Sequence, residues 1–298
     1  MPEGDTIFRA AATLSRAIGG KIVRRFHSPL PALAASAAQL EGRRIERVEA
    51  RGKNLLIHFE DGSALHTHMR MTGSWHIYRP GEAWQKPARY ARAVIETDDF
   101  VAVCFNAPVV DRIPPGAIAS HPSLSKLGPD ILKADFDADL ARRRLRERAG
   151  TPIGEALMNQ QALAGIGNIY KSESLFACRV DPWLTVGDLP DESLDALIRA
   201  ARELMSQNLS GPTRITAHAG ARGFFPRRGP RYCVYDRAGE PCLTCGEPIR
   251  ASRASRASRA DLPGPSSTSP GGVASRVTYW CPACQPPGST GALSDPKT

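Results

Sequence analysis

The sequence predicts an α+β fold with several domains: an antiparallel β-sandwich with an N-terminal helix, a helical domain, and a C-terminal zinc ribbon. Three observations support this prediction. Short apolar runs with two-residue alternation occupy positions 21–108, apolar residues at helical spacing recur over positions 137–204, and two Cys-x-x-Cys pairs follow. The length of 298 residues suggests about two domains, and the 42% of apolar residues can build their cores.

The composition indicates a polyanionic partner. The net charge is +9 and the isoelectric point is 9.4, with 39 Lys and Arg against 30 Asp and Glu. Such an excess favours nucleic acid as the partner, and a membrane surface is the second choice. The sequence has no run of 18 apolar residues and no charged-then-apolar leader. We therefore expect a cytoplasmic protein with no membrane span.

The first expected element is a short helix that could hold the N-terminus against a core. Four apolar residues recur at helical spacing: Ile7, Ala11, Leu14 and Ile18. Asp5 or Thr6 is suited to cap the start of this helix, and Gly19-Gly20 is suited to end it.

Seven short segments then have the pattern of strands. They are residues 22–26, 45–48, 54–59, 64–68, 75–78, 92–96 and 100–105. Turns are expected at Asp61-Gly62 and at residues 97–99. This number of strands at this spacing predicts an antiparallel sandwich, which Pro114-Pro115-Gly116 ends.

The middle of the chain is expected to be helical. Residues 137–148 form a basic amphipathic stretch, and Pro152 is suited to open a helix through Gln161. Residues 163–168 form a glycine turn between that helix and a second one that ends near Ala177. A last helix starts near Asp191. Such a turn can offer backbone N–H groups to a phosphate, although alone it would be read as a plain helical hairpin.

Four of the seven cysteines form two pairs that indicate a structural metal. The pairs are Cys242 with Cys245 and Cys281 with Cys284. Four thiolates in this pattern are typical of one tetrahedral zinc site, which takes the place of a core in a small module. The pairs are 35 residues apart because an Ala-Ser-Arg repeat and a Pro, Ser and Gly stretch separate them. This low-complexity insertion is expected to be disordered. The remaining Cys104, Cys178 and Cys233 are expected to be packing residues.

The N-terminus carries a second chemical signal. Removal of Met1 would leave Pro2 as a secondary amine with a pKa of roughly 8, so that a usable fraction is unprotonated near neutral pH. Attack of this amine on a sugar carbon would give a cationic iminium, which withdraws electrons, and Glu3 could move the protons. Taken alone, however, Pro2 and Glu3 are better read as ordinary residues after a start codon.

Several separate motifs, in one order, resemble those of the formamidopyrimidine-DNA glycosylase and endonuclease VIII family of base-excision repair enzymes. The resemblance runs from the N-terminus to about Gln285. Its motifs are Pro2-Glu3-Gly4, residues 51–56 (Arg-Gly-Lys-Asn-Leu-Leu), His68 with 71–74 (Met-Thr-Gly-Ser), 127–130 (Leu-Gly-Pro-Asp), 163–170 (Leu-Ala-Gly-Ile-Gly-Asn-Ile-Tyr), 234–239 (Val-Tyr-Asp-Arg-Ala-Gly) and 276–282 (Arg-Val-Thr-Tyr-Trp-Cys-Pro).

The resemblance implies three catalytic residues. Pro2 would be the nucleophile at C1′ of the damaged nucleotide, and Glu3 would be the acid-base partner that opens the sugar ring. Lys53, which follows Gly52 in a turn, would stabilise developing charge near the base or a phosphate. Without the resemblance, Lys53 would be read as an ordinary exposed lysine.

The resemblance also implies DNA-binding residues. His68, Asn168 and Arg276 would contact phosphates, and Met71 would fill the gap left by the flipped base. On pattern alone, Met71 would be a core residue, His68 would be structural and Arg276 would be solvated. The metal ligands would be Cys242, Cys245, Cys281 and Cys284, holding one structural zinc ion away from the chemistry.

The domains implied are a catalytic β-sandwich at 1–116, a helix-two-turns-helix DNA-binding domain at 117–212 and a zinc finger at 213–286. The insertion at about 250–273 and the tail at 287–298 would be disordered. The implied partner is damaged DNA, and we expect a monomer with no membrane partner. The implied activity combines a DNA glycosylase with an abasic-site lyase that cleaves the strand by β- or β,δ-elimination.

Two features favour oxidised pyrimidines as the substrates. Gly4 after Glu3 is similar to the endonuclease VIII branch, and residues 108–111 (Pro-Val-Val-Asp) replace an Arg-Arg-Phe element typical of the oxidised-purine branch. An oxidised-purine glycosylase is the alternative within the family.

Two other classes of protein remain as alternatives. A damaged-DNA or abasic-site binding protein could keep the fold without catalysis, although it would not need Pro2, Glu3 and Lys53. A zinc-ribbon nucleic-acid protein unrelated to repair would explain the charge and the cysteines, but not the N-terminal motif or the glycine turn.

Overall fold

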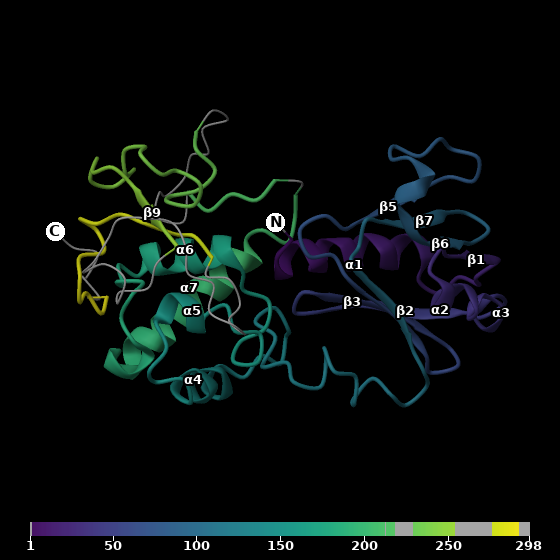
Figure 1. The fold of residues 1–298 in the computed structure, drawn as a ribbon, viewed down its shortest axis with the longest axis horizontal. Helices are drawn as coiled ribbons and strands as arrows, with labels where there is room; N and C mark the ends of the chain where they lie inside the picture. Colours follow the sequence, from purple (N-terminus) through teal and green to yellow (C-terminus); the bar gives the residue numbers. More distant parts are fainter. Residues whose placement is uncertain (1, 212, 218–228, 254–275, 292–298) are drawn as a thin grey trace. The chain divides into compact units, whose positions relative to one another are not determined.

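The structure is a computed structural model, shown in Figure 1, that describes residues 2–211, 213–217, 229–253 and 276–291. The chain divides into two compact units, Met1–Leu127 and Gly128–Thr298. Within the described ranges, no helix combines the length and the apolar character needed to cross a lipid bilayer.

The first unit begins with helix α1 (Gly4–Ile18), whose apolar face packs on strands β2, β3 and β5. The helix starts earlier than predicted, because Glu3 rather than Asp5 or Thr6 is the N-cap residue. The Glu3 carbonyl accepts hydrogen bonds from the backbone of Thr6 and Ile7 at 2.9 and 3.1 Å. Gly19 ends the helix, and a Cβ atom there would lie 2.4 Å from the carbonyl oxygen of Ser15.

The strands of the first unit form two four-stranded antiparallel sheets, as predicted for a sandwich, and they lie beside α1 in Figure 1. The order of the first sheet is β1 (Arg25–His27), β6 (Ala91–Glu96), β7 (Val101–Phe105) and β5 (Ser74–Tyr78). The order of the second sheet is β2 (Ile45–Arg51), β3 (Asn54–Phe59), β4 (Ala64–His68) and β8 (Val109–Ile113). Apolar residues from α1 and both sheets share one core. The short helices α2 (Pro31–Ala34), α3 (Ala37–Leu40) and η1 (Ala88–Tyr90) lie in the connections.

One strand prediction was wrong, and one strand was missed. The strand predicted at 22–26 is shorter and shifted, since Ile22 makes only an isolated bridge with Arg44. Strand β8 was not predicted, because its polar Asp111 and Arg112 are followed by two prolines. Its partner β4 is more than 40 residues away in the sequence, with His66 opposite Asp111, and no local pattern announces such a pairing.

The connector, residues 114–127, covers the outer face of the second sheet. Its Leu124 packs with Leu56, Ala64 and Ile113 of that sheet. The inner face of β3 contributes Leu55, Ile57 and Phe59 to the shared core, so all six residues of the strand are buried.

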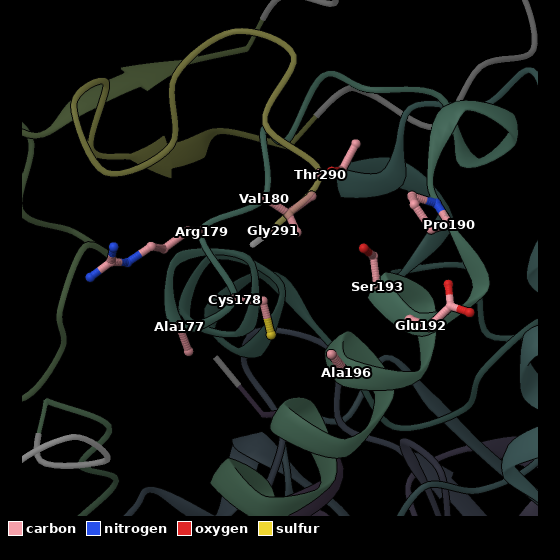
Figure 2. Close-up of a pocket in the computed structure, with 10 residues that line it drawn as sticks. All are labelled: Ala177, Cys178, Arg179, Val180, Pro190, Glu192, Ser193, Ala196, Thr290 and Gly291. Carbon is pink, nitrogen blue, oxygen red and sulfur yellow. The ribbon is translucent and has the colours of Figure 1, made fainter. Parts of the chain in front are cut away.

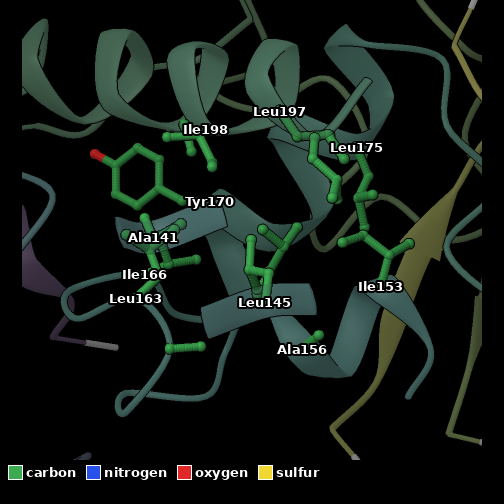
Figure 3. Close-up of a cluster of buried hydrophobic side chains, with 14 of the residues drawn as sticks. Ala141, Leu145, Ile153, Ala156, Leu163, Ile166, Tyr170, Leu175, Leu197 and Ile198 are labelled. Carbon is green, nitrogen blue, oxygen red and sulfur yellow. The ribbon is translucent and has the colours of Figure 1, made fainter. Parts of the chain in front are cut away.

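The second unit has its own helical core, shown in Figure 3. Its helices are α4 (Ala138–Arg146), α5 (Ile153–Ala156), α6 (Asn168–Ala177), η2 (Val186–Asp188) and α7 (Asp191–Ser206). The helix predicted from Pro152 to Gln161 stops at Ala156. The Asn159 side chain accepts a hydrogen bond from the backbone of Gln161, which favours a turn over a helix.

Strands β9 (Arg250–Ser252) and β10 (Thr278–Trp280) form an antiparallel pair in the second unit. The predicted disorder of the insertion was therefore wrong for residues 250–252, while residues 254–273 lie outside the described ranges. The predicted disorder of the tail was wrong for residues 287–291. There, the backbone of Asp181 donates to the carbonyl of Ser289, and Gly288 donates to the Asp181 carboxylate, both at 2.9 Å.

Candidate functional site

Pro2 and Glu3 lie directly before helix α1. Glu3 is fully buried and Pro2 is partly exposed. Because α1 packs on three strands through Ile7, Leu14 and Ile18, it holds the start of the chain in a fixed place on the first unit. The N-terminus is thus presented by a rigid element, which suits a group that must attack at one atom.

Lys53 and His68 are brought together by the hairpin geometry of the second sheet. Gly52 has a φ of +56°, which allows the tight turn between β2 and β3, and Lys53 follows it. Asn54 pairs directly with His68 across β3 and β4. The ring of His68 is partly buried, and this burial, together with the charges of His66, Lys53 and Arg70, lowers its pKa to about 4.

His68 is therefore neutral at physiological pH. The backbone N–H of Arg70 donates to Nδ1 of His68 at 3.2 Å, so the ring hydrogen belongs on Nε2. The predicted phosphate contact would then be a neutral N–H donor and not a cation. Arg70 is a further cation beside His68 that the sequence interpretation did not single out.

Met71 lies in a tight loop after β4 and is 57% exposed. The loop closes through a hydrogen bond of 2.8 Å from the backbone of Gly73 to the carbonyl of Met69. A Cβ atom on Gly73 would lie 2.7 Å from the Cα atom of Met69 and 3.0 Å from that of Ala107. The interpretation of Met71 as a core residue is wrong, and its exposure suits a residue that inserts into DNA.

Asn168 and Arg276 come together in the second unit. Asn168 is the first residue of α6, and its Nδ2 donates to the carbonyl of Val277 at 2.9 Å, next to Arg276. Asn168 is 6% exposed, and within the described part of the chain its Oδ1 is buried without a hydrogen-bond partner. One of its two amide hydrogens is used within the protein, so Asn168 also positions the segment that carries Arg276.

Lys171 supports the same segment and was not predicted. It is fully buried one turn after Asn168, and its Nζ donates to the Thr278 hydroxyl at 2.9 Å and to the Val277 carbonyl at 3.3 Å. A buried lysine gives no signal in the sequence, because lysine is normally exposed.

Glu173 joins α6 to the segment that precedes the cysteine pairs. Its carboxylate accepts from the Thr216 hydroxyl at 2.5 Å and from the backbone of Cys233, Val234 and Tyr235 at 2.8 to 2.9 Å. Four donors satisfy this buried carboxylate, so Glu173 holds the segment before the cysteine pairs in a defined position against α6.

The four paired cysteines form one cluster that could hold a metal ion, with all four sulfur atoms within 4.8 Å of one another. Cys245 lies 3.4 Å from Cys281 and 3.6 Å from Cys284, and Cys242 lies 3.9 Å from Cys284, between the Sγ atoms. A tetrahedral ion with metal–sulfur bonds of about 2.3 Å needs sulfur atoms about 3.8 Å apart. The donor set and the spacing therefore fit such an ion.

A pocket of about 410 Å³ lies elsewhere in the second unit, between the end of α6 and the start of α7 (Figure 2). Cys178, Ser193 and Ala196 are among the residues that line it. None of the predicted site residues lines this pocket.

Family models match both units. The formamidopyrimidine-DNA glycosylase N-terminal domain matches residues 1–108, and the formamidopyrimidine-DNA glycosylase H2TH domain matches residues 127–218. A probable endonuclease 8 of Streptomyces coelicolor is 38% identical over 96% of this chain and 94% of that protein. The chain belongs to the formamidopyrimidine-DNA glycosylase and endonuclease VIII family.

Other members of this family are also similar to this chain over nearly its whole length. The DNA-(apurinic or apyrimidinic site) lyase Nei2 of Mycolicibacterium smegmatis is 34% identical over 96% of this chain and 99% of that protein. The structure of the formamidopyrimidine-DNA glycosylase of Thermus thermophilus has a TM-score of 0.71 and 28% identity, and covers 95% of this chain and 98% of that one. The Lactococcus lactis enzyme bound to abasic-site DNA has a TM-score of 0.74 at 21% identity, and covers 96% of this chain and all of that one.

The comparisons confirm the predicted family and the fold class. The assignment of individual roles to Pro2, Glu3 and Lys53, and to the DNA-binding residues, stays a prediction from the motifs.

Proposed function

We propose that this family member acts in base excision repair as a DNA glycosylase and abasic-site lyase that removes oxidised pyrimidines, with Pro2 as its nucleophile. The observation that carries the proposal is the N-terminus. Pro2 lies at the start of a helix anchored in the core, beside the fully buried Glu3, in the domain matched by the family model. Relatives named endonuclease 8 and abasic-site lyase support the activity.

The reaction begins at the amine that is left after Met1 is removed. The nitrogen lone pair of Pro2 attacks C1′, and the base leaves with the electrons of the N-glycosidic bond and takes up the proton that the amine loses. Glu3 donates a proton to the ring oxygen as the sugar opens, which gives an iminium between Pro2 and C1′. Lys53 stabilises negative charge that develops at the base or a phosphate.

The iminium then drives strand cleavage. It withdraws electrons from C1′, so the C2′ proton is lost, and the 3′ phosphate leaves with the electrons of its bond to C3′. A second elimination on the 5′ side would leave a one-nucleotide gap. Hydrolysis of the iminium by water returns the free amine.

Oxidised pyrimidines are the proposed substrates because of the segment at 108–111. It lacks an Arg-Arg-Phe element, and Val109 and Asp111 of that segment are paired in strand β8 opposite β4. Relatives named endonuclease 8 also favour this branch. An oxidised-purine glycosylase remains the second candidate.

The proposed partner is damaged DNA, bound mainly through its phosphates by a monomeric, cytoplasmic protein. The proposed metal is one zinc ion held by Cys242, Cys245, Cys281 and Cys284. Zinc there would fix the fold of the module and take no part in the reaction.

Borohydride trapping tests the proposal. Purified protein, with loss of Met1 verified by intact mass, is mixed with duplex DNA that carries one abasic site, one oxidised pyrimidine or one oxidised purine. We expect a covalent adduct with the abasic site and with the oxidised pyrimidine. The adduct should disappear when the Pro2 amine is blocked or Met1 is retained.

The other outcomes separate the parts of the proposal. An adduct with abasic DNA and the oxidised purine, but not the pyrimidine, would keep the amine chemistry and contradict the lesion class. Tight binding to abasic DNA with no adduct would contradict catalysis and favour a damage-binding protein.

A further inference from the structure

A second group of metal-binding side chains lies in the first unit, on the outer face of the sheet β2-β3-β4-β8. It consists of His66 of β4, Asp111 of β8 and His121 of the connector. Their donor atoms all lie within 4.8 Å of one another. We propose that these three side chains bind one divalent transition-metal ion, separate from the four-cysteine site.

The distances suit an ion between the three side chains. Oδ1 of Asp111 lies 3.0 Å from Nδ1 of His66, and Oδ2 of Asp111 lies 3.0 Å from Nε2 of His121. With metal–ligand bonds of about 2.1 Å, two ligand atoms are about 3.0 Å apart at the right angle of octahedral coordination and about 3.4 Å apart at the tetrahedral angle. Each carboxylate oxygen is therefore at a ligand–ligand distance from one histidine.

The sheet register makes the site rigid. His66 and Asp111 are directly opposite in the ladder between β4 and β8, so their side chains share one face. Connector residues on both sides of His121, Ile118 and Leu124, pack on the apolar cluster of the same face. The third ligand is thus held over the other two by packing.

A hydrogen-bond chain orients His66 for a metal. Its Nε2 lies 2.9 Å from Oδ1 of Asn54, and Nδ2 of Asn54 donates to the Arg51 carbonyl at 3.1 Å. The bond to Arg51 fixes the Asn54 amide, so Nε2 of His66 must be the donor. This arrangement, in which one ring nitrogen donates to an oxygen and the other faces the ion, is usual for metal-binding histidines.

A metal ion also provides a better partner for the buried ring of His66 than hydrogen bonds alone. His66 is fully buried, and both of its ring nitrogens face oxygen acceptors. Without an ion, both ring nitrogens would have to donate hydrogen bonds to these oxygens. A metal at Nδ1 takes the place of one hydrogen.

The ligand set indicates the class of ion. Two imidazoles and one carboxylate suit zinc, nickel, cobalt or iron(II) and do not suit magnesium or calcium, which prefer oxygen. The Asp111 side chain is 38% exposed, so water can reach the ion and complete its coordination. The ion would join the connector to β4 and β8, which makes the site structural.

Calorimetric titration of the full chain, prepared with one zinc per molecule at the four cysteines, tests the proposal. Nickel chloride and zinc chloride are the probes. We expect the wild type to take up one further equivalent. Asp111→Asn and His121→Ala should each weaken this uptake by roughly a hundredfold or abolish it. Both positions are partly exposed, so both variants should fold.

His58→Gln is the matched control. His58 is a buried histidine of the same sheet, but it pairs with Glu49 at 3.0 Å and is not part of the cluster. The control should keep the second equivalent. The proposal is overturned if the wild type takes up no metal beyond the first zinc, or if His121→Ala and Asp111→Asn bind as tightly as the wild type.

Discussion

Single residues of the candidate site differ in how rigidly the fold positions them, and Lys53 is one that the backbone holds in a defined place. Lys53 is placed by the turn at Gly52, and its charge is close enough to His68 to lower the pKa of that ring. A cation held in a fixed turn can act on developing charge without reorganising, which is the form of electrostatic catalysis that contributes most to rates.

Replacing Lys53 with Met should therefore slow base removal. We expect a loss of roughly a hundred- to a thousandfold in the single-turnover rate on an oxidised pyrimidine, because one preorganised charge is lost. Lys53→Arg keeps the charge and should recover much of the rate. Equal rates for Lys53→Met and the wild type would show that Lys53 is an ordinary surface lysine.

His76 should make the stability of the first unit depend on pH. Burial and the nearby Lys86 lower the pKa of His76 below its ordinary value of 6.5. In the unfolded chain, His76 takes up a proton as the pH falls below about 6.5, whereas the folded ring stays neutral, so acid favours unfolding. The full stability of the first unit, as far as it depends on His76, is present above about pH 6.5 and decreases as the pH falls below that value.

Denaturant titrations between pH 7.5 and 5 measure this effect. The stability of His76→Gln should fall less steeply with decreasing pH than that of the wild type. His27→Gln, at an exposed histidine, should keep the wild-type slope. If His76→Gln also kept that slope, the partly buried ring of His76 would not be the cause.

Elements were predictable from the sequence where their pattern is local. The alternation at 54–59 and 64–68 matches β3 and β4 at both ends, and α6 ends at Ala177 as predicted. The pairing of β8 with β4 and the burial of Lys171 depend on contacts between distant segments, so no local pattern reveals them. The exposure of Met71 was missed on pattern alone, because it depends on the close approach at Gly73.

The Met71 loop gives a prediction at the scale of this element. Gly73→Ala would place Cβ 2.7 Å from the Cα atom of Met69 and 3.0 Å from that of Ala107, both backbone atoms that cannot rotate away. The loop must shift, so we expect a loss of about 1–3 kcal/mol in stability and slower excision from duplex DNA.

Gly150→Ala provides the control, because its Cβ atom would meet nothing within 4 Å. Thermal melts and excision rates measure the two variants. If Gly73→Ala behaved like Gly150→Ala in both measurements, the close approach would not determine the loop.

The net charge of the whole molecule overstates the number of arginines that can bind phosphates. Many arginines are already engaged by carboxylates within each unit. Arg24 pairs with Asp98 through two bonds of 2.8 and 3.0 Å, and Arg142 donates to Asp195 at 2.6 Å. The net charge of +9 therefore attracts DNA at long range, but only some of the arginines should displace counterions when it binds.

The salt dependence of DNA binding distinguishes the two kinds of arginine. Affinity falls as salt rises, and each phosphate contact makes the slope of log affinity against log salt concentration more negative by about 0.9. Arg276, exposed beside the segment held by Asn168 and Lys171, is a predicted phosphate contact. Arg276→Ala should make this negative slope shallower by about one. Arg24→Ala, at an exposed arginine paired with Asp98, should leave the slope unchanged. If both variants kept the wild-type slope, Arg276 would not contact a phosphate, and the positions of Asn168 and Lys171 would have to be explained by the fold alone.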